Sequence, residues 1–511
     1  MINSQFYKRF FYYTLCIIPG LGFLIHRIRF TYFNVDEFQH TYLAWATTHF
    51  DMIQYRDFWD NHGILYTLFN SAILKIFEPE VGVPAIMLER YANLALLIIG
   101  FYILFEVFYE LSSKLHYASL GVLCFSYGLI SQKGIEVRPD NLQCIFLYSA
   151  LLVLFKALKR RNNKLAFIAG LFITLMLMTN LKSISALMGI GFGLIVALAY
   201  ERSKSLMSLI LWLGAGILSG LVVFALGFLS WGILDDYINW NVIFNFQFTH
   251  DNLGHASLKY LHEIYYTNYF AWSLLCLCGG FFFSLKSFEE IKNRNYLGLI
   301  LSCLILNCFV TRSIYLFWTQ FDLLYLPIVC FSVSYMFFWI LDLKLNRYLL
   351  FAIWVLGLLI CLQLSFCSYA KLLNDWRIVD HYFRQFDSRT KKIYSYLGSS
   401  GYLDYYGIDS CPGFGFNRNS NFLIHKYRQS IYSMEKIEQK EIFGRTYINE
   451  LNNKKVKLII ATRKGILSNH HYSTVKYIFD NYKYVNCLWI RTTPFEAAPF
   501  GAALTGSTKP R

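Results

Sequence analysis

Two short polar segments stand near the start of an otherwise apolar chain. The first contains Asp36 and Glu37, and the second contains Asp60, Asn61 and His62. A carboxylate can deprotonate an acceptor hydroxyl or amine as a general base, and a divalent cation can hold a phosphate leaving group. Ionisable residues at a membrane face are costly and usually functional. These residues predict polar chemistry at a membrane surface, and a solvated loop is the alternative interpretation.

The elements that must position these residues are membrane helices. The chain has 511 residues, of which 56% are hydrophobic and 19% aromatic. Only 15% are charged, against the ~25% of soluble domains. The composition therefore predicts an all-α polytopic membrane protein with about eleven transmembrane helices. We expect them near residues 10–28, 85–108, 116–132, 142–158, 165–181, 184–200, 206–231, 269–285, 296–312, 320–340 and 348–368.

Lysine and arginine in the short loops indicate the orientation of these helices. They are concentrated in alternate connections, which the positive-inside rule assigns to the cytoplasm together with the amino terminus. The opposite, outer connections carry most of the polar residues of interest. A random distribution would place such residues at both faces, so their shared face is itself informative. The outer set is Asp36, Glu37, Asp60, His62, Glu136, Arg138, Asp140, Lys182, His250, His255, Arg312 and Asp322.

Three parts are expected along the chain. Residues 1–370 form the transmembrane domain, with outer loops at 29–84 and 232–268; Phe38, Tyr42 and Trp45 indicate an interfacial helix in the first. Residues 371–495 are expected to form a small extracytoplasmic α/β domain, with strands at 456–462 and 484–490 around a helix at 472–481. Residues 496–511 form a loose tail. Residues 371–511 carry most of the net charge of +15, which suits either anionic lipid head groups or solubility alone.

Four motifs, taken in order, resemble the GT-C class of membrane glycosyltransferases. The nearest likeness is the bacterial branch related to protein O-mannosyltransferases and the lipid A aminoarabinose transferase. It covers about residues 10–370. Two departures from the family pattern are Gly63-Ile64, where paired prolines are usual, and Asn180, which separates a threonine from its lysine. The motifs are the acidic pair Asp36-Glu37, the segment 55–66 (YRDFWDNHGILY), the segment 136–140 (EVRPD) and the segment 178–182 (MTNLK).

The resemblance implies a role for each residue of the first outer loop. Asp36 is expected to be the catalytic base, and Glu37 to support it or bind substrate. Asp60 is expected near the donor phosphate, with His62 as its neighbour. If a divalent cation takes part, the resemblance and the histidines of the second outer loop point to Asp60 and His255 as ligands.

The later motifs are expected to bind substrate. Asp140 would position the acceptor, with a helix cap as the alternative. Arg138 would bind phosphate or pair with Glu136. Lys182 and Arg312 would bind the phosphate of the lipid carrier, whereas snorkelling to the interface is the alternative for Lys182.

The expected function is sugar transfer from a polyprenyl-phosphate carrier to an extracytoplasmic lipid, glycan or protein acceptor. The resemblance implies inversion at the anomeric carbon. A bacterial inner membrane is the expected location, and no nucleic acid is an expected partner. One alternative is an enzyme like the O-antigen ligases or polymerases, which use diphosphate-linked donors. Another is a secondary transporter, which should show internal repeats and charges near the midplane, and the sequence shows neither.

Overall fold

The structure is a computed structural model. It describes residues 4–30, 35–51, 53–56, 60, 62–79, 83–112, 115, 134–243, 245, 296–314, 323–325, 327–329, 331–332, 458–460, 480, 482–485 and 488–491. The chain divides into two compact units. One comprises Met1–Thr31, Asn61–Phe69 and Glu89–Tyr369, and the other comprises Tyr32–Asp60, Asn70–Leu88 and Ala370–Arg511.

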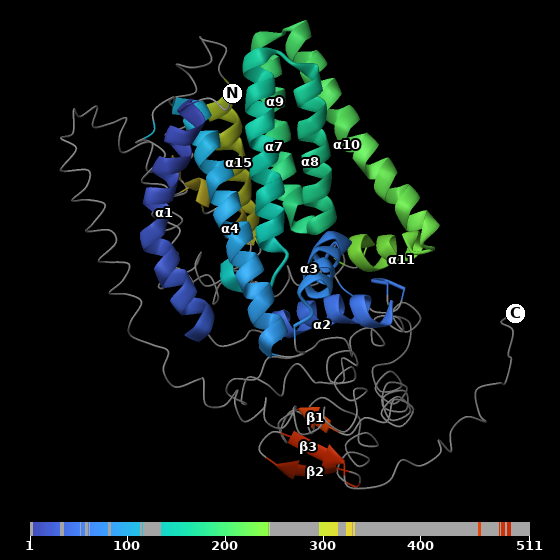
Figure 1. Cartoon of the computed structure of the whole chain (residues 1–511). Helices are drawn as coiled ribbons and strands as arrows, with labels where there is room; N and C mark the ends of the chain where they lie inside the picture. The colour runs from blue at the N-terminus through green and yellow to red at the C-terminus, as the bar shows by residue number, and fades with distance from the viewer. Residues whose placement is uncertain are drawn as a thin grey trace, which may run out of the picture. The chain divides into compact units, whose positions relative to one another are not determined.

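Long apolar helices make up the first unit (Figure 1). Each predicted span that falls in the described ranges is helical, with bounds that differ by a few residues. The predicted spans at 116–132, 269–285 and 348–368 lie outside the described residues, and the span at 320–340 is described only in short helical pieces. The helices are α1 (Ser4–Phe30), α4 (Val83–Ser112), α7 (Asp140–Arg160), α8 (Asn163–Thr179), α9 (Ile184–Glu201), α10 (Lys204–Ser230) and α15 (Leu297–Ile314).

Polar side chains and left-handed residues fix where these helices begin and end. Asn162 caps α8, and its side chain accepts the main-chain N–H groups of residues 164 and 165 at 2.9 and 3.2 Å. Ser203 caps α10 in the same way. Helix α7 ends at Arg161 and α9 at Arg202, both with φ of 49°. Such caps satisfy main-chain groups that a helix leaves free at its ends, so α7, α8, α9 and α10 follow one another through short connections.

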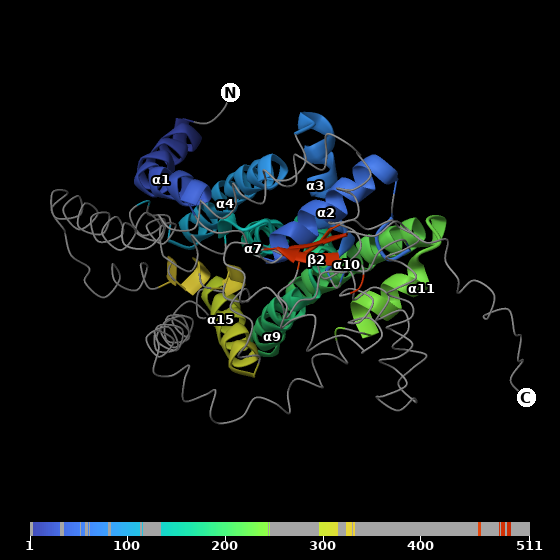
Figure 2. The ribbon, with the colours of Figure 1, turned by 90° about the horizontal axis from the view of Figure 1, so that it is seen from below.

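Small residues allow the helices to pack closely. A Cβ built on Gly216 of α10 would lie 2.1 Å from the main-chain oxygen of Phe167 in α8. A Cβ on Gly189 of α9 would lie 2.7 Å from the Cα of Leu304 in α15. Figure 2 shows α9 and α15 side by side. Close contact through small residues is typical of helices that associate in a membrane, where burial of apolar surface supplies little driving force.

The exterior of α10 is apolar and exposed. Leu211, Leu218 and Val223 are 66%, 63% and 67% exposed. Contiguous exposed apolar surface of this kind is disfavoured in water and is what a lipid-facing helix requires. By length and composition, four helices of the described ranges can cross a membrane: Pro84–Leu111, Asp140–Arg160, Leu181–Glu201 and Lys204–Ser230.

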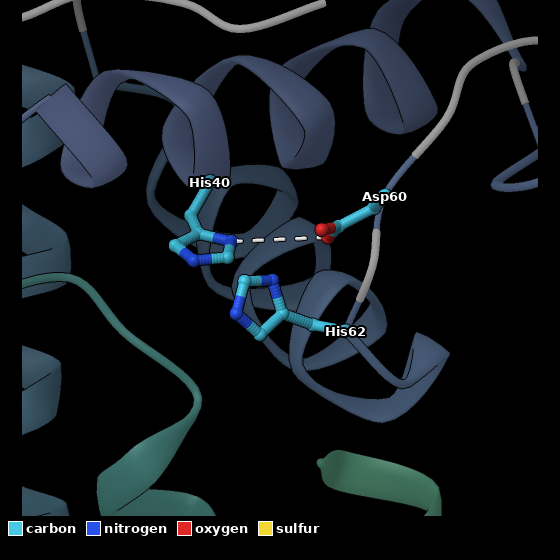
Figure 3. Close-up of side chains that lie close together, drawn as sticks. All are labelled: His40, Asp60 and His62. Atoms are coloured by element: carbon cyan, nitrogen blue, oxygen red, sulfur yellow. Dashed lines mark ion pairs between the residues drawn. The ribbon is translucent and has the colours of Figure 1, made fainter. Parts of the chain in front are cut away.

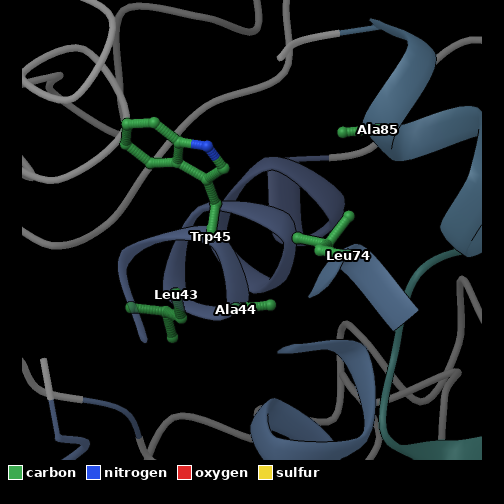
Figure 4. Packing of buried hydrophobic residues seen from close by; sticks show 5 residues of the cluster. All are labelled: Leu43, Ala44, Trp45, Leu74 and Ala85. Carbon is green, nitrogen blue, oxygen red and sulfur yellow. The ribbon is translucent and has the colours of Figure 1, made fainter. Parts of the chain in front are cut away.

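In the second unit, helix α2 (Val35–Phe50) packs against the second half of α3 (Ile64–Phe77). The Ser71 hydroxyl donates to the main-chain oxygen of Ala44 at 3.1 Å, and the Thr48 hydroxyl donates to that of Ser71 at 3.2 Å. The predicted helix of the first outer loop is therefore present. Figure 4 shows the apolar cluster beside this contact, formed by Leu43, Ala44, Trp45, Leu74 and Ala85.

The described strands lie near the carboxyl end. β1 (Leu458–Ile460) and β2 (Tyr482–Val485) both pair antiparallel with β3 (Leu488–Arg491). The prediction of a strand at 456–462 is confirmed in its central residues. The prediction of one strand at 484–490 is wrong, because these residues belong to two strands, β2 and β3, which pair antiparallel with Val485 opposite Leu488. The predicted helix at 472–481 lies outside the described residues except at position 480, which is helical.

Candidate functional site

The first turn of α2 carries the acidic pair. Positions 36 and 40 are one helical turn apart, on the same face of the helix. Glu37 is buried, and so is His40. The sequence reasoning did not identify His40, although its spacing of four residues from Asp36 on an expected helix was a usable signal.

Asp60 and His40 lie close together in the second unit (Figure 3). The Nδ1 atom of His40 is 4.0 Å from Oδ2 of Asp60, and both side chains are almost completely buried. His62 follows two residues after Asp60 in the sequence and belongs to the first unit.

His40 and Asp60 fit two ligands of a divalent cation. An imidazole and a carboxylate suit zinc and similar borderline metals. Ligand atoms around a tetrahedral zinc ion lie roughly 3.4 Å apart, as bond lengths of about 2.0–2.2 Å require. Inward movement by about half an ångström, within the scale of a side-chain adjustment, would bring the two ligand atoms to that spacing.

Gly63 joins this segment to the turn that follows α8. Its N–H donates to the main-chain oxygen of Thr179 at 3.0 Å. A Cβ at this position would lie 1.7 Å from the main-chain oxygen of Met178 and 2.9 Å from the main-chain carbon of Thr179. Only glycine permits this approach. Gly63, which departs from the family pattern, therefore brings the second and fourth motifs together.

The fourth motif forms a tight turn that ends in Lys182. Asn180 ends α8 and begins the 3₁₀ turn η2 (Leu181–Ser183). Its side-chain Oδ1 accepts the N–H of Lys182 at 3.1 Å, and its main-chain oxygen accepts Nε2 of Gln143 at 3.1 Å. Lys182 itself is half-buried. The inserted asparagine is thus the residue that shapes the turn.

The third motif is a buried ionic triad. The Nη1 atom of Arg138 lies 3.0 Å from Glu136, and its Nε atom lies 3.6 Å from Asp140. All three side chains are buried. Asp140 stands in the first turn of α7 and makes no side-chain cap bond, since Pro139 occupies the cap position. Of the two interpretations of Arg138, the structure contains the pair with Glu136.

A network of buried amides ties the helices together near these motifs. The side-chain nitrogen of Asn93 donates to the Tyr66 hydroxyl at 2.9 Å. That of Asn141 donates to Oδ1 of Asn93 at 3.3 Å and to the main-chain oxygen of Gly134. In the connection after α10, the Tyr237 hydroxyl donates to the sulfur of Met178 at 3.5 Å. Burial raises the pKa of Tyr237 to about 12, so the phenol remains a neutral donor.

Another set of ion pairs lies at the opposite end of the bundle. They join Arg9 to Glu106, Lys159 to Glu110 and Arg161 to Glu201. Because α7 has 21 residues, its two ends are about 30 Å apart. The expected gathering of the third and fourth motifs at one end of the helices is therefore present in the first unit.

Three predicted site residues, His250, His255 and Asp322, lie outside the described residues. Asp36 and Arg312 are described only as backbone positions in α2 and α15. The metal ligand pair Asp60 and His255 stays a prediction. Charged residues of α4 were missed because an apolar window hides them. Glu89 and Arg90 are buried there, and Arg90 donates to the main-chain oxygen of Ile28 at 2.9 Å.

No protein-family description matches this sequence, and no curated protein matches it. The similar solved structures include the oligosaccharyltransferase of Archaeoglobus fulgidus in its apo form, with a TM-score of 0.47 and 12% identity over 77% of this chain and 60% of that one. The structure of the same protein with Zn and sulfate has a TM-score of 0.45 and 12% identity over 75% of this chain and 56% of that one. Its complex with an inhibitory peptide and a dolichol-phosphate has a TM-score of 0.44 and 12% identity over 86% of this chain and 60% of that one.

This chain spans about 56–60% of the length of those proteins. TM-scores below 0.5 do not establish a common fold.

Proposed function

We propose that this chain is an integral-membrane glycosyltransferase of the GT-C kind. It would transfer a sugar from a polyprenyl-phosphate carrier to an extracytoplasmic acceptor. The observation that carries the proposal is the contact between Gly63 and Thr179. Through it, the segment that contains His62 meets the turn that presents Lys182, although the two are far apart in the sequence.

Such a combination suits a phosphate leaving group on a lipid. A half-buried ammonium attracts an anion, and the low dielectric of its surroundings strengthens that attraction. His40 and Asp60 would hold a divalent cation, which would supply charge neutralisation for the phosphate. Arg312 is proposed as a second phosphate ligand, and Arg138 as the residue that keeps Asp140 in place at the start of α7.

The proposed reaction is one in-line displacement. The acceptor oxygen or nitrogen forms a bond to the anomeric carbon, and the bond from that carbon to the phosphate oxygen breaks. The phosphate leaves on the carrier with the electron pair, and the configuration inverts. Asp36 takes the proton of the acceptor, and Glu37, one residue along α2, supports it. A positioned general base contributes typically 10²–10⁴-fold in rate.

The proposed topology has eleven spans, an amino terminus inside and the active site and tail outside. Both the polar end of the helices and the carboxyl-terminal domain would then face the periplasm of a bacterium. Donors linked to polyprenyl phosphate are compatible with that side, whereas nucleotide sugars are cytoplasmic.

Mass spectrometry of intact glycolipids and glycans tests the function. Cells with the gene should contain a product heavier by one sugar than that of cells without it. Asp36→Asn should fail to restore this product. The control is Asp51→Asn, which changes an exposed carboxylate next to the end of α2 at a φ of 51° that asparagine tolerates. Identical glycan profiles with and without the gene would contradict the proposal.

A further inference from the structure

Asn180 is the residue around which the turn between α8 and α9 is built. Its main-chain oxygen accepts Nε2 of Gln143 at 3.1 Å and the N–H of Ser183 at 3.2 Å. Its side-chain oxygen accepts the N–H of Lys182 at 3.1 Å. A side-chain oxygen that accepts a main-chain N–H two residues on forms an Asx turn, which sets the backbone direction locally.

We propose that Asn180 is a positioning residue for recognition of the donor phosphate. It fixes the direction in which Lys182 leaves the turn and thereby sets how the ammonium meets the phosphate. This inference rests on the proposed function, in which Lys182 binds the phosphate of the polyprenyl carrier.

The backbone matters here because of the nature of lysine. Its ammonium is a point charge on a flexible four-carbon stem, so the side chain has no rigid geometry of its own. The position of its Cα therefore decides how much conformational freedom is lost when the ammonium contacts an anion. A turn that holds residue 182 in one place reduces the conformational entropy that is lost when the anion binds.

The turn is anchored on two further sides. Gln143, three residues after Asp140, ties it to α7. Gly63 ties it to the segment with His62, through Thr179. Movement of the turn would therefore alter the distance between Lys182 and that segment, which are the two groups proposed to share one phosphate.

The Asn180 side chain is also buried. The residue is 2% exposed, and its hydrogen bonds to Gln143, Lys182 and Ser183 are therefore largely shielded from water. Shielded hydrogen bonds hold a turn more firmly than exposed ones do.

Binding of a polyprenyl phosphate without sugar tests the inference. The full-length protein in lipid nanodiscs is titrated with this probe, and the Kd is measured for wild type, Lys182→Ala, Asn180→Ala and the double variant. Asn180→Ser retains an oxygen that can accept the N–H of Lys182. The matched control is Asn162→Ala, which removes the equivalent cap at the other end of α8. Thermal midpoints are recorded for every variant.

Lys182→Ala should weaken binding roughly ten- to a hundredfold, the range expected for hydrogen bonds to a charged group. Asn180→Ala should weaken it about three- to tenfold, and Asn180→Ser should recover part of the loss. The double variant should bind like Lys182→Ala alone, because Asn180 acts through Lys182. Asn162→Ala should lower the thermal midpoint and leave the Kd unchanged.

A wild-type Kd for Asn180→Ala would overturn the inference. The inference would also be overturned if Asn180→Ala weakened binding further in a protein that already carries Lys182→Ala. An equal loss of affinity in Asn162→Ala would overturn it too, because either result would mean a general structural effect. If Lys182→Ala binds like wild type, the phosphate role in the proposed function is wrong, and the positioning role falls with it.

Discussion

Gly63→Ala is the substitution that most severely strains the proposed site. The added Cβ would lie 1.7 Å from the main-chain oxygen of Met178, whereas real Cβ contacts are at least 3.0 Å. The two backbones must therefore separate by about 1.3 Å, and the bond from Gly63 N–H to Thr179, worth about 1 kcal/mol, is lost. Because the clashing atoms belong to the main chain, no side-chain rotation relieves the contact.

Such a displacement should be far more damaging to transfer than to folding. Misplacement of a reacting group by 1 Å can cost about a hundredfold in rate, whereas overpacking typically costs about 1–3 kcal/mol of stability. We expect Gly63→Ala to insert into the membrane and to lower kcat/KM about a hundredfold.

The assay follows product formation by mass spectrometry in membrane vesicles with equal amounts of protein. Gly191→Ala is the control, because nothing lies within 4 Å of a Cβ at that position of α9. It should retain full activity. Near-normal turnover by a folded Gly63→Ala protein would refute the reasoning that this contact sets the geometry of the site.

The remaining predictions address the base, the ionic triad, the metal and the topology. Asp36→Asn should lower turnover by ~10²–10⁴-fold without loss of folding; a folded variant with normal turnover would exclude it as the base. Arg138→Gln should cost about 3–5 kcal/mol of stability because buried carboxylates lose their partner, whereas a purely phosphate-binding arginine would leave the thermal midpoint unchanged. His40→Ala should reduce the zinc or manganese retained by the purified protein, measured by elemental mass spectrometry; equal metal content would exclude a site at His40 and Asp60. In a protein without reactive cysteines, a cysteine introduced at exposed position 160 should be protected from thiol labelling in intact cells, and a cysteine introduced at position 464 should be labelled. The reverse pattern would contradict the topology.

Hydropathy located the helices well because a membrane span needs a long apolar run. The expected span 142–158 is the helix Asp140–Arg160, and the small error arises because the ends depend on residues such as Pro139 and Arg161. The expected strand 484–490 was wrong for a different reason. Residues on both sides of Asn486 and Cys487 favour strands, and no glycine or proline separates them in the sequence.

The site was predictable in its residue types and only partly in its contacts. Shared loops and order indicated that Asp60, His62 and Lys182 belong to one end of the helices. Nothing in the spacing showed that Gly63 touches Thr179, since a close main-chain approach leaves no periodic signal. His40 was missed because it lies within an amphipathic stretch, and only the fold brings it to 4.0 Å from Asp60.

The identity of the released lipid tests the central claim most directly. The purified protein is reconstituted in vesicles with a lipid extract of cells that lack the gene, and polyprenyl lipids are quantified by mass spectrometry as product forms. Transfer from a monophosphate-linked donor predicts release of one polyprenyl phosphate for each sugar transferred, and none with Asp36→Asn. Release of polyprenyl diphosphate would instead identify an enzyme like the O-antigen ligases, and transfer with no polyprenyl product would contradict the proposed donor.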